Sequence, residues 1–327
     1  MKSKIIKIIG PCLLLAMFML VINKSNAQQP IPVPDSHLAL AEGRLLGING
    51  QLKPGVPPSA NFDLLDWSLT LPTDLNKDNK ADMIYEKPLS DGFELSPLFY
   101  TAEDGGMVFA CPNEGAKTSK NTKYARTELR EMLRRGNRSM KTQGITGNNW
   151  VFSGTHGSVK RQAGAIEGSL EATLAVNRVS TTGDIKKVGR VIIGQIHATD
   201  DEPIRLYYRK LPDNKKGSIY FAHEINGGDD IWINLIGSRS HTLSDPTDGI
   251  GLDEKFSYKI SVESNVLHVT VIRQDKPNIT RSLDMSESGY FKNNQYMYFK
   301  AGVYNQNNSG EPRDYAQATF YYLNNIH

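Results

Sequence analysis

Short hydrophobic runs that alternate with polar residues, or are rich in β-branched and aromatic residues, recur along the chain from about residue 60. Turn-forming residues such as Asn226-Gly227 bound nearly all of them, and few windows keep a helical stripe for three turns. The runs cover Leu64–Leu71, Met107–Ala110, Leu170–Val176, Val188–Ile196, Ile204–Tyr208, Ile219–Ile225, Ile231–Ile236, Phe256–Val262, Val266–Ile272, Tyr296–Tyr304 and Ala316–Leu323. About a dozen strands without long helices predict an all-β fold, a two-sheet β-sandwich of the jelly-roll type.

The first 27 residues have a different pattern. Lys2, Lys4 and Lys7 precede an apolar run over Cys12–Ile22, and Ser25-Asn26-Ala27 supplies small residues for a cleavage site. The run is shorter than the about 20 residues of a membrane span. A buried core helix is the alternative, but the charged start and the Pro-rich stretch that follows weigh against it. We therefore predict a signal peptide over residues 1–27, no membrane span, and a secreted or periplasmic protein.

Residues 28–59 form a Pro-rich stretch that a short helical pattern, Leu38–Leu46, interrupts. The stretch is either a tether or an arm packed against the domain, and its composition fits both. From residue 60 there is no change of composition and no internal repeat. We therefore predict a single domain over residues 60–327.

The composition of the 327 residues is that of a soluble globular protein, with 39% hydrophobic and 22% charged residues. It excludes collagen-like, disordered and disulfide-stapled chains. The formal net charge of +3 includes four lysines of the predicted signal peptide, so the remainder carries −1, which disfavours a nucleic-acid binder. Only Cys111 remains after cleavage, so no intrachain disulfide can form, and we interpret it as a small buried hydrophobe.

Three predicted strands present a row of polar residues opposite a row of apolar ones. Because side chains alternate along a strand, each row lies on one face, with the other face on the core and the polar face lining a groove. Taken alone, each row has a simpler interpretation. The first is a surface charge ladder, the second a structural or solvated polar pair, and the third an exposed amphipathic strand. Together they supply carboxylate binders and proton carriers, the groups that a reaction on an acidic sugar needs. The rows are Arg126, Glu128 and Arg130; Gln195 and His197; and Tyr298, Lys300, Gly302, Tyr304 and Gln306.

These three segments resemble, in order, the signature strands of alginate lyases of polysaccharide lyase family seven, and Trp67–Pro72 is similar to the opening strand of that family. The resemblance covers roughly residues 60–327. It implies a jelly roll with a concave groove that cleaves the 1,4-glycosidic bonds of alginate by β-elimination and leaves unsaturated uronate ends. The stretch Asp200–Asp230 is long, and with the Pro-rich arm it leaves endo or exo action open.

The resemblance also implies roles for the polar residues. Arg126 and Gln195 would neutralise the carboxylate of the sugar, so that the C5 proton can leave. His197 is the candidate base and Tyr304 the candidate acid for the departing O4 oxygen; on mannuronate, where both groups lie on one face, Tyr304 could serve both ends. Glu128, which we place between Arg126 and Arg130, would orient the arginines with a lowered pKa.

The remaining polar residues of the rows are predicted to bind neighbouring carboxylates or hydroxyls of the substrate. Ile196, which points away from the groove, accompanies activity on guluronate-containing blocks within this family, so we expect a preference for such blocks. The predicted substrate-binding residues are Glu128, Arg130, Lys300, Tyr298 and Gln306.

No metal or cofactor is expected. The stretch Asp74–Asp82 alternates oxygen ligands like the opening of a calcium loop, but Asn79 and Tyr85 replace the required Gly and Glu, which favours a polar turn between two strands. No His/Cys cluster suggests zinc. The expected partner is an acidic polysaccharide, alginate or its oligosaccharides, and we expect a monomer that binds no nucleic acid.

Other functions remain alternatives. A lyase that acts on another polyuronate is the alternative most similar to an alginate lyase. A non-catalytic carbohydrate-binding sandwich is a second alternative, but it would not need an aligned His197 and Tyr304. A glycoside hydrolase needs two carboxylates across the scissile bond, and the motif strands offer only Glu128, flanked by arginines.

Overall fold

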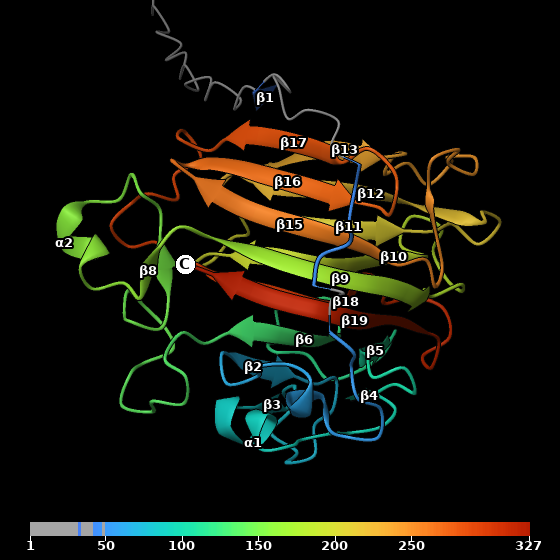
Figure 1. Ribbon diagram of the computed structural model, residues 1–327, viewed down its shortest axis with the longest axis horizontal. Helices are drawn as coiled ribbons and strands as arrows, with labels where there is room; N and C mark the ends of the chain where they lie inside the picture. Colours follow the sequence, from blue (N-terminus) through green and yellow to red (C-terminus); the bar gives the residue numbers. More distant parts are fainter. Residues whose placement is uncertain (1–31, 34–41, 48–49) are drawn as a thin grey trace, which may run out of the picture.

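The chain folds into two large antiparallel β-sheets packed face to face (Figure 1). The computed structural model describes residues 32–33, 42–47 and 50–327. Sheet one has eight strands in the order β1-β17-β16-β15-β9-β19-β5-β4. Their bounds are β1 Pro32–Val33, β4 Phe99–Thr101, β5 Met107–Pro112, β9 Gly168–Arg178, β15 Phe256–Glu263, β16 Val266–Ile272, β17 Ile279–Asp284 and β19 Tyr315–Ile326.

Sheet two has nine strands, with β13-β12-β11-β10-β18-β6-β2-β3 in order and β14 paired to β12. Its strands are β2 Trp67–Thr70, β3 Met83–Ile84, β6 Arg126–Glu131, β10 Arg190–His197, β11 Ile204–Arg209, β12 Lys216–Glu224, β13 Asp230–Ile236, β14 Ile250–Gly251 and β18 Tyr298–Asn305. A small parallel pair, β7 (Trp150–Val151) and β8 (Ala165–Ile166), lies beside them. The short helices are η1 Pro58–Ala60, α1 Glu86–Ser90 and α2 Gly157–Lys160.

The hydrophobic core lies between the two sheets, where alternate residues of each strand meet. Two polar groups that face this layer form hydrogen bonds across it. The Tyr258 hydroxyl of sheet one donates to the Ile193 carbonyl of sheet two at 2.9 Å, and Thr127 Oγ1 donates to the Ala110 carbonyl at 2.6 Å. These cross-sheet bonds fix how the two sheets face each other, because buried polar groups are costly without partners.

The predicted jelly-roll sandwich is confirmed, and every predicted hydrophobic run contains a strand. Short or polar strands such as β3 and β17 were missed, because β17 (Ile279–Asp284) carries only two apolar residues. The helical pattern predicted over 38–46 is wrong where the structure describes it, since residues 42–46 are not helical. The predicted signal peptide, residues 1–27, lies outside the described residues.

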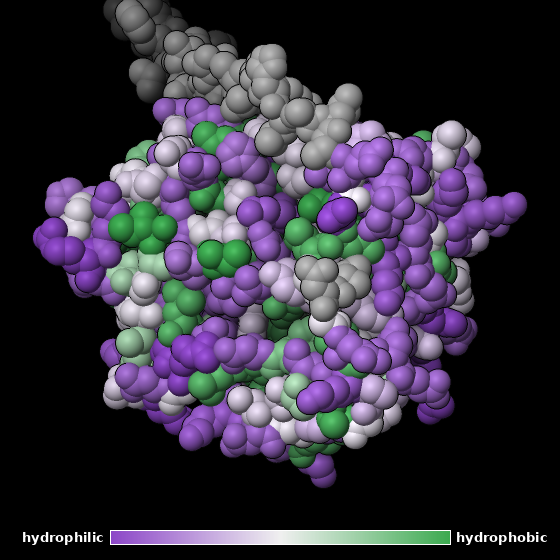
Figure 2. All heavy atoms as spheres, viewed as in Figure 1, coloured by the Kyte–Doolittle hydropathy of each residue, from purple (hydrophilic) through white to green (hydrophobic). Residues whose placement is uncertain are grey.

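The described parts of the Pro-rich stretch contact sheet one. β1 pairs with the edge strand β17, and the Leu46 backbone N–H donates to Ser257 Oγ at 2.9 Å while its carbonyl accepts from Thr173 Oγ1 at 2.7 Å. Gly47 has a φ of +64°, and a Cβ there would lie 1.9 Å from the Tyr322 ring. Figure 1 shows this segment crossing the outer face of the sheet, and Figure 2 shows that face to be mainly hydrophilic with scattered apolar residues.

Among the described residues, no helix combines the length and the apolar character that a membrane crossing requires.

Candidate active site

The face of sheet two that points away from the core carries a groove of about 920 Å³. Strands β6, β10 and β18 line its centre, strands β11 to β13 line one side, and residues around Met83, Tyr124 and Gln143 line the other. Of the residues predicted from the sequence, those that line the groove are Arg126, Arg130, His197, Tyr298, Lys300, Tyr304 and Gln306. The two that do not are Glu128 and Gln195, which are buried beneath its floor.

Strand register brings the three polar rows together. β18 lies between β10 and β6, so Lys300 is paired with Gln195 on one side and with Arg130 on the other. Further along, Tyr304 is paired with Ile192 and with Arg126. Since neighbouring strands lie about 4.8 Å apart, the rows form one continuous patch.

A β-bulge at Ile193 explains why the alternation of β10 changes along the strand. On the neighbouring strand β11, Ile192 pairs with Tyr207 and Gly194 pairs with the adjacent Leu206. Ile193 is therefore an extra residue of β10 without a partner on β11. Ile193 and Ile196 both face the core although they are three residues apart. The bulge thus turns Gln195 and His197 toward the groove side, as predicted, and Ile196 away from it.

Gly302 is required where β18 passes Glu128. Its φ is +135°, and a Cβ at this position would lie 2.7 Å from the Thr127 carbonyl oxygen and 3.0 Å from Glu128 Cα. Only glycine fits this close approach of the two strands.

Glu128 is the centre of a buried ion network. Its Oε2 contacts Arg126 Nη1 at 3.1 Å and Lys300 Nζ, and its Oε1 accepts from Gln195 Nε2. Burial alone would raise the pKa of Glu128, but the charges of Lys300 and Arg126 and these hydrogen bonds hold it below its ordinary value. Glu128 is therefore an ionised carboxylate that orients the cations, and it does not contact the groove.

The sequence predicted that Glu128 would lie between Arg126 and Arg130. In the structure the second cation in contact with Glu128 is Lys300, so the prediction is wrong for Arg130. Arg130 instead donates from Nη2 to the Thr142 carbonyl at 2.7 Å, and its guanidinium lies 4.0 Å from the centre of the Tyr298 ring. The residue spacing was compatible with both arrangements, and the pairing of β18 with β6 decides between them.

Arg126 extends from the network toward the groove. Its guanidinium carbon lies 3.6 Å from the centre of the Tyr304 ring, and its Nε is buried without a partner among the described residues. Gln195 is fully buried, so in this structure its amide acts on Glu128 and has no exposed surface toward a ligand. A direct contact of Gln195 with substrate therefore requires movement of the groove floor.

His197 faces the groove as a neutral imidazole. Its Nδ1 lies 2.6 Å from the Ala198 carbonyl oxygen, which only accepts, so Nδ1 carries the proton and Nε2 has a free lone pair. The ring stacks on Tyr298 with centres 5.0 Å apart. Burial and the nearby positive charge of Lys300 lower the pKa of His197 to about 3. The imidazole is thus a proton acceptor at neutral pH.

Tyr304 is a protonated phenol at neutral pH. Burial raises the pKa of its hydroxyl, and the positive charge of Arg126 opposes this without reversing it. Burial together with Arg126 also lowers the pKa of Lys300 to about 8, so Lys300 is still mainly a cation near pH 7. The patch therefore offers one proton acceptor, one proton donor and two cations.

A second group of charged residues, missed in the sequence, lies beside His197. Arg205 of β11 contacts Asp230, with Glu224 at 3.5 Å and Glu202 at 3.9 Å. Burial, then hydrogen bonding with Glu202, raises the pKa of Glu224 to about 7. The available signal was the alternation of Arg205 with Tyr207 on β11, which has the same polar-row pattern as the three recognised strands.

An aromatic cluster continues the groove over β11, β12 and β13. Tyr207 and Tyr220 stack with centres 5.0 Å apart, and Trp232 lies 5.6 Å from Tyr207. The tyrosines are buried, whereas Trp232 is partly exposed in the groove with the guanidinium of Arg239 4.5 Å from its ring centre. Aromatic faces of this kind pack against sugar rings through their apolar C–H surface.

The stretch Asp74–Asp82, whose spacing is similar to the opening of a calcium loop, joins β2 to β3. Asp74 accepts backbone N–H bonds from Asp78 at 2.9 Å and from Asn79 at 3.0 Å, so its oxygens are engaged in the turn. Within the part of the chain that the structure describes, no group of three or more His, Cys, Asp or Glu residues is arranged to hold a metal ion.

Comparison with known proteins identifies similar chains. The family model described as alginate lyase matches residues 62–327. A curated alginate lyase of Klebsiella pneumoniae is 53% identical over 279 residues, which are 83% of this chain and 91% of that protein. The crystal structure of the Klebsiella pneumoniae alginate lyase matches with a TM-score of 0.82 over 83% of this chain and 98% of that one.

More distant solved structures share the fold. The alginate lyase PA1167 of Pseudomonas aeruginosa is 28% identical, with a TM-score of 0.59 over 81% of this chain and all of that one. A variant of the family 7 alginate lyase A1-II′ in complex with a product (GGG) is 25% identical, with a TM-score of 0.58 over 83% of this chain and all of that one.

Proposed function

This chain belongs to the alginate lyase family, and from that premise we propose that it cleaves the 1,4-glycosidic bonds of alginate by β-elimination in the groove of sheet two. The observation that carries the proposal is the single patch in which His197, Tyr304, Arg126 and Lys300 meet. Membership of the family shows that the chain is an alginate lyase. The patch supports separate roles for its residues in proton transfer and charge stabilisation.

The chemistry requires that a proton leave C5, next to the carboxylate of the uronate. A carbanion there is prohibitive unless positive groups spread the developing charge. Arg126 and Lys300 provide two cations against one carboxylate, Glu128, which leaves an excess positive charge facing the groove. Tight electrostatic support of this kind, fixed before the substrate arrives, lowers the cost of the enolate-like state.

Proton transfer then has two partners. The C5–H bond breaks and its proton goes to Nε2 of His197, while the bonding electrons form the C4–C5 double bond. The C4–O4 bond breaks, and the Tyr304 hydroxyl gives its proton to O4. The neutral Nε2 lone pair of His197 and the raised pKa of Tyr304 support these assignments.

We further propose a preference for guluronate-containing blocks. In guluronate the C5 proton and O4 lie on opposite faces of the ring, which calls for separate base and acid. His197 pairs with Tyr298 and Tyr304 pairs with Ile192, so the two groups flank Lys300 from opposite ends of β18. This arrangement, and Ile196 between Gln195 and His197, support the preference.

The test is a measurement of products from polyguluronate and polymannuronate. We expect ultraviolet absorbance from unsaturated uronate ends, rising faster on polyguluronate. New reducing ends without absorbance would instead indicate hydrolysis, and binding without either signal would indicate a carbohydrate-binding module. A faster rise on polymannuronate would contradict the block preference alone.

Export is also proposed, on the basis of the N-terminal pattern of residues 1–27. If the full chain is expressed in a bacterium and the exported protein is sequenced from its N-terminus, we expect it to begin at Gln28. Retention of the uncleaved chain in the cytoplasm would contradict this.

A further inference from the structure

Glu202 lies in the connection between β10 and β11, beside the imidazole of His197. Its Oε1 is 3.4 Å from His197 Nε2, the ring nitrogen that faces the groove. Its Oε2 is 3.9 Å from Arg205 Nε, so the side chain is held from the β11 side. The Glu202 side chain is about one-fifth exposed at 21% and therefore sits at the groove wall.

The contact has an unusual proton balance. Because Nδ1 of His197 donates to the Ala198 carbonyl, Nε2 carries no proton and acts as an acceptor. A carboxylate is also an acceptor, so the 3.4 Å contact becomes a hydrogen bond only when a proton is added between the two groups. Proton abstraction from the substrate adds that proton.

The surroundings make an added proton on His197 costly. Lys300 and Arg126 place positive charge near the ring, and burial removes water from it. Glu128 opposes this only in part, because its carboxylate already serves Arg126, Lys300 and Gln195. On the other side, Arg205 is matched by Glu202, Glu224 and Asp230. Among these groups, Glu202 is the carboxylate in direct contact with Nε2.

We propose that Glu202 is a positioning residue that stabilises the imidazolium of His197 and accepts its proton after the elimination. This inference rests on the proposed function, since it assigns a partner to the proposed base. The C5–H bond breaks as Nε2–H forms; Nε2–H then breaks as the carboxyl O–H of Glu202 forms. Glu202 releases the proton to water, and water returns one proton to the Tyr304 phenolate, so the cycle closes without any other reactant.

Glu224 supports this role as a proton-sharing neighbour. The Glu202 backbone N–H donates to Glu224 Oε2 at 3.4 Å, so the Glu224 carboxyl group is held next to Glu202. Burial, then the neighbouring carboxyl group of Glu202, raises the pKa of Glu224 to about 7. As the pH falls through 7, Glu224 gains a proton and the negative charge beside Glu202 and His197 decreases.

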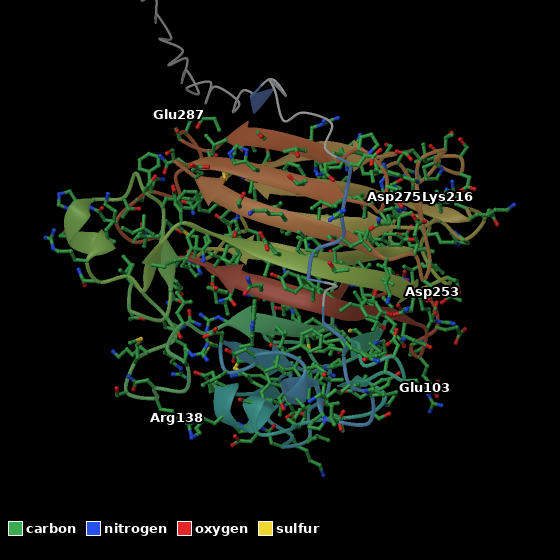
Figure 3. The ribbon with its side chains drawn as sticks, in the orientation of Figure 1. Glu103, Arg138, Lys216, Asp253, Asp275 and Glu287 are labelled. Carbon is green, nitrogen blue, oxygen red and sulfur yellow. The ribbon has the colours of Figure 1, made fainter. Side chains whose placement is uncertain are left out.

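The experiment compares Glu202→Gln with Glu103→Gln in the full-length mature enzyme acting on guluronate oligomers. Glu103 is an exposed residue between β4 and β5, at the periphery in Figure 3, and serves as the matched control. We expect Glu202→Gln to lower kcat about tenfold with KM nearly unchanged, because an opposite charge at this distance shifts a pKa by about one unit or more. We also expect it to remove the decline of kcat on the acidic side of pH 7.

Two further variants separate this role from a structural one. Glu202→Asp keeps the charge and is expected to recover part of the lost kcat. Glu224→Gln removes the carboxyl group that gains a proton near pH 7 and is expected to move the acidic decline to lower pH. Thermal unfolding of each variant identifies any that fails to fold, in which case Glu224→Gln still tests the proposal through the pH profile.

The outcomes are distinct. If Glu202→Gln matches Glu103→Gln in kcat and pH profile, or if Glu224→Gln leaves the acidic decline unchanged, the assignment of Glu202 is overturned. If wild-type enzyme and Glu103→Gln give no unsaturated product at all, the proposed elimination itself fails.

Discussion

Two ion networks with opposite charge balance lie side by side in sheet two, at and beneath the floor of the groove. In the first, one carboxylate, Glu128, serves two cations, Arg126 and Lys300. In the second, one guanidinium, Arg205, is surrounded by Glu202, Glu224 and Asp230. The first joins β6 to β18, and the second joins β11, β12 and β13 to the connection between β10 and β11, with His197 between the two networks.

Both networks are partly or fully buried, and the charges around each carboxylate decide whether it is ionised or protonated. With two cations, Glu128 stays ionised in spite of burial, and the excess positive charge can meet the carboxylate of a substrate. In the second network burial, then the neighbouring carboxyl group of Glu202, raises the pKa of Glu224 to about 7, and the single cation Arg205 opposes this only in part. The same sheet geometry thus yields an anion-binding site and a proton-holding site.

The largest expected effect comes from removing the proton donor beside the first network, Tyr304, whose ring lies against Arg126. Tyr304→Phe is expected to lower kcat on alginate by about 10²- to 10⁴-fold, because a positioned general acid contributes that much. The measurement is the ultraviolet absorbance of the unsaturated product. Tyr315→Phe, on sheet one, is the control, and near wild-type turnover of Tyr304→Phe would remove Tyr304 from the mechanism.

The second prediction compares the two networks directly. Glu128→Gln leaves the Arg126 and Lys300 charges buried without their carboxylate, and we expect a loss of about 3–5 kcal/mol in the free energy of unfolding. Glu224→Gln at pH 7 replaces a group that is already partly protonated, so we expect a change within about 1 kcal/mol. Urea unfolding of both variants checks this, and equal losses would contradict the difference drawn between the networks.

The third prediction concerns acid stability on β12, where His223 neighbours Glu224. His223 is buried between the Pro203 carbonyl and Ser288 Oγ, each at 2.7 Å, and burial lowers its pKa to about 4. Because the unfolded chain binds the proton first, the stability that neutral His223 contributes is complete above about pH 6.5 and is lost as the pH falls to 4.

The effect of pH on stability has the opposite sign for Glu224, because its pKa is raised in the folded protein. The stability that Glu224 contributes is complete below about pH 4.5 and is lost as the pH rises through 7. We therefore expect His223→Gln to gain about 2–3 kcal/mol relative to wild type between pH 6.5 and 4, as followed by urea unfolding at several pH values. A difference between the two proteins that does not vary with pH would contradict the buried neutral state of His223.

The smallest expected effect lies in the aromatic cluster beyond the second network. Trp232→Ala is expected to raise KM for oligomers about three- to tenfold with little change in kcat, because an aromatic face contributes about 0.5–1.5 kcal/mol to packing. Trp232→Phe keeps a ring and is the matched control. A fall in kcat at constant KM would place Trp232 in the chemical step instead.

Local sequence determined the strands and the faces of their side chains. Period-two alternation is a property of a single strand, so the rows containing Arg126, His197 and Tyr304 could be assigned to a groove face before any neighbour was known. The same reasoning placed Ile196 in the core. The two-sheet sandwich followed from the number of such strands.

Tertiary structure decided which rows meet and in what register. The position of β18 between β10 and β6 puts Lys300, and not Arg130, beside Glu128, and the bulge at Ile193 sets the direction of Gln195. Arg205, Glu202 and Glu224 come together only because β11 and β12 pair beside β10. Register depends on packing between residues far apart in the chain, which no local pattern specifies.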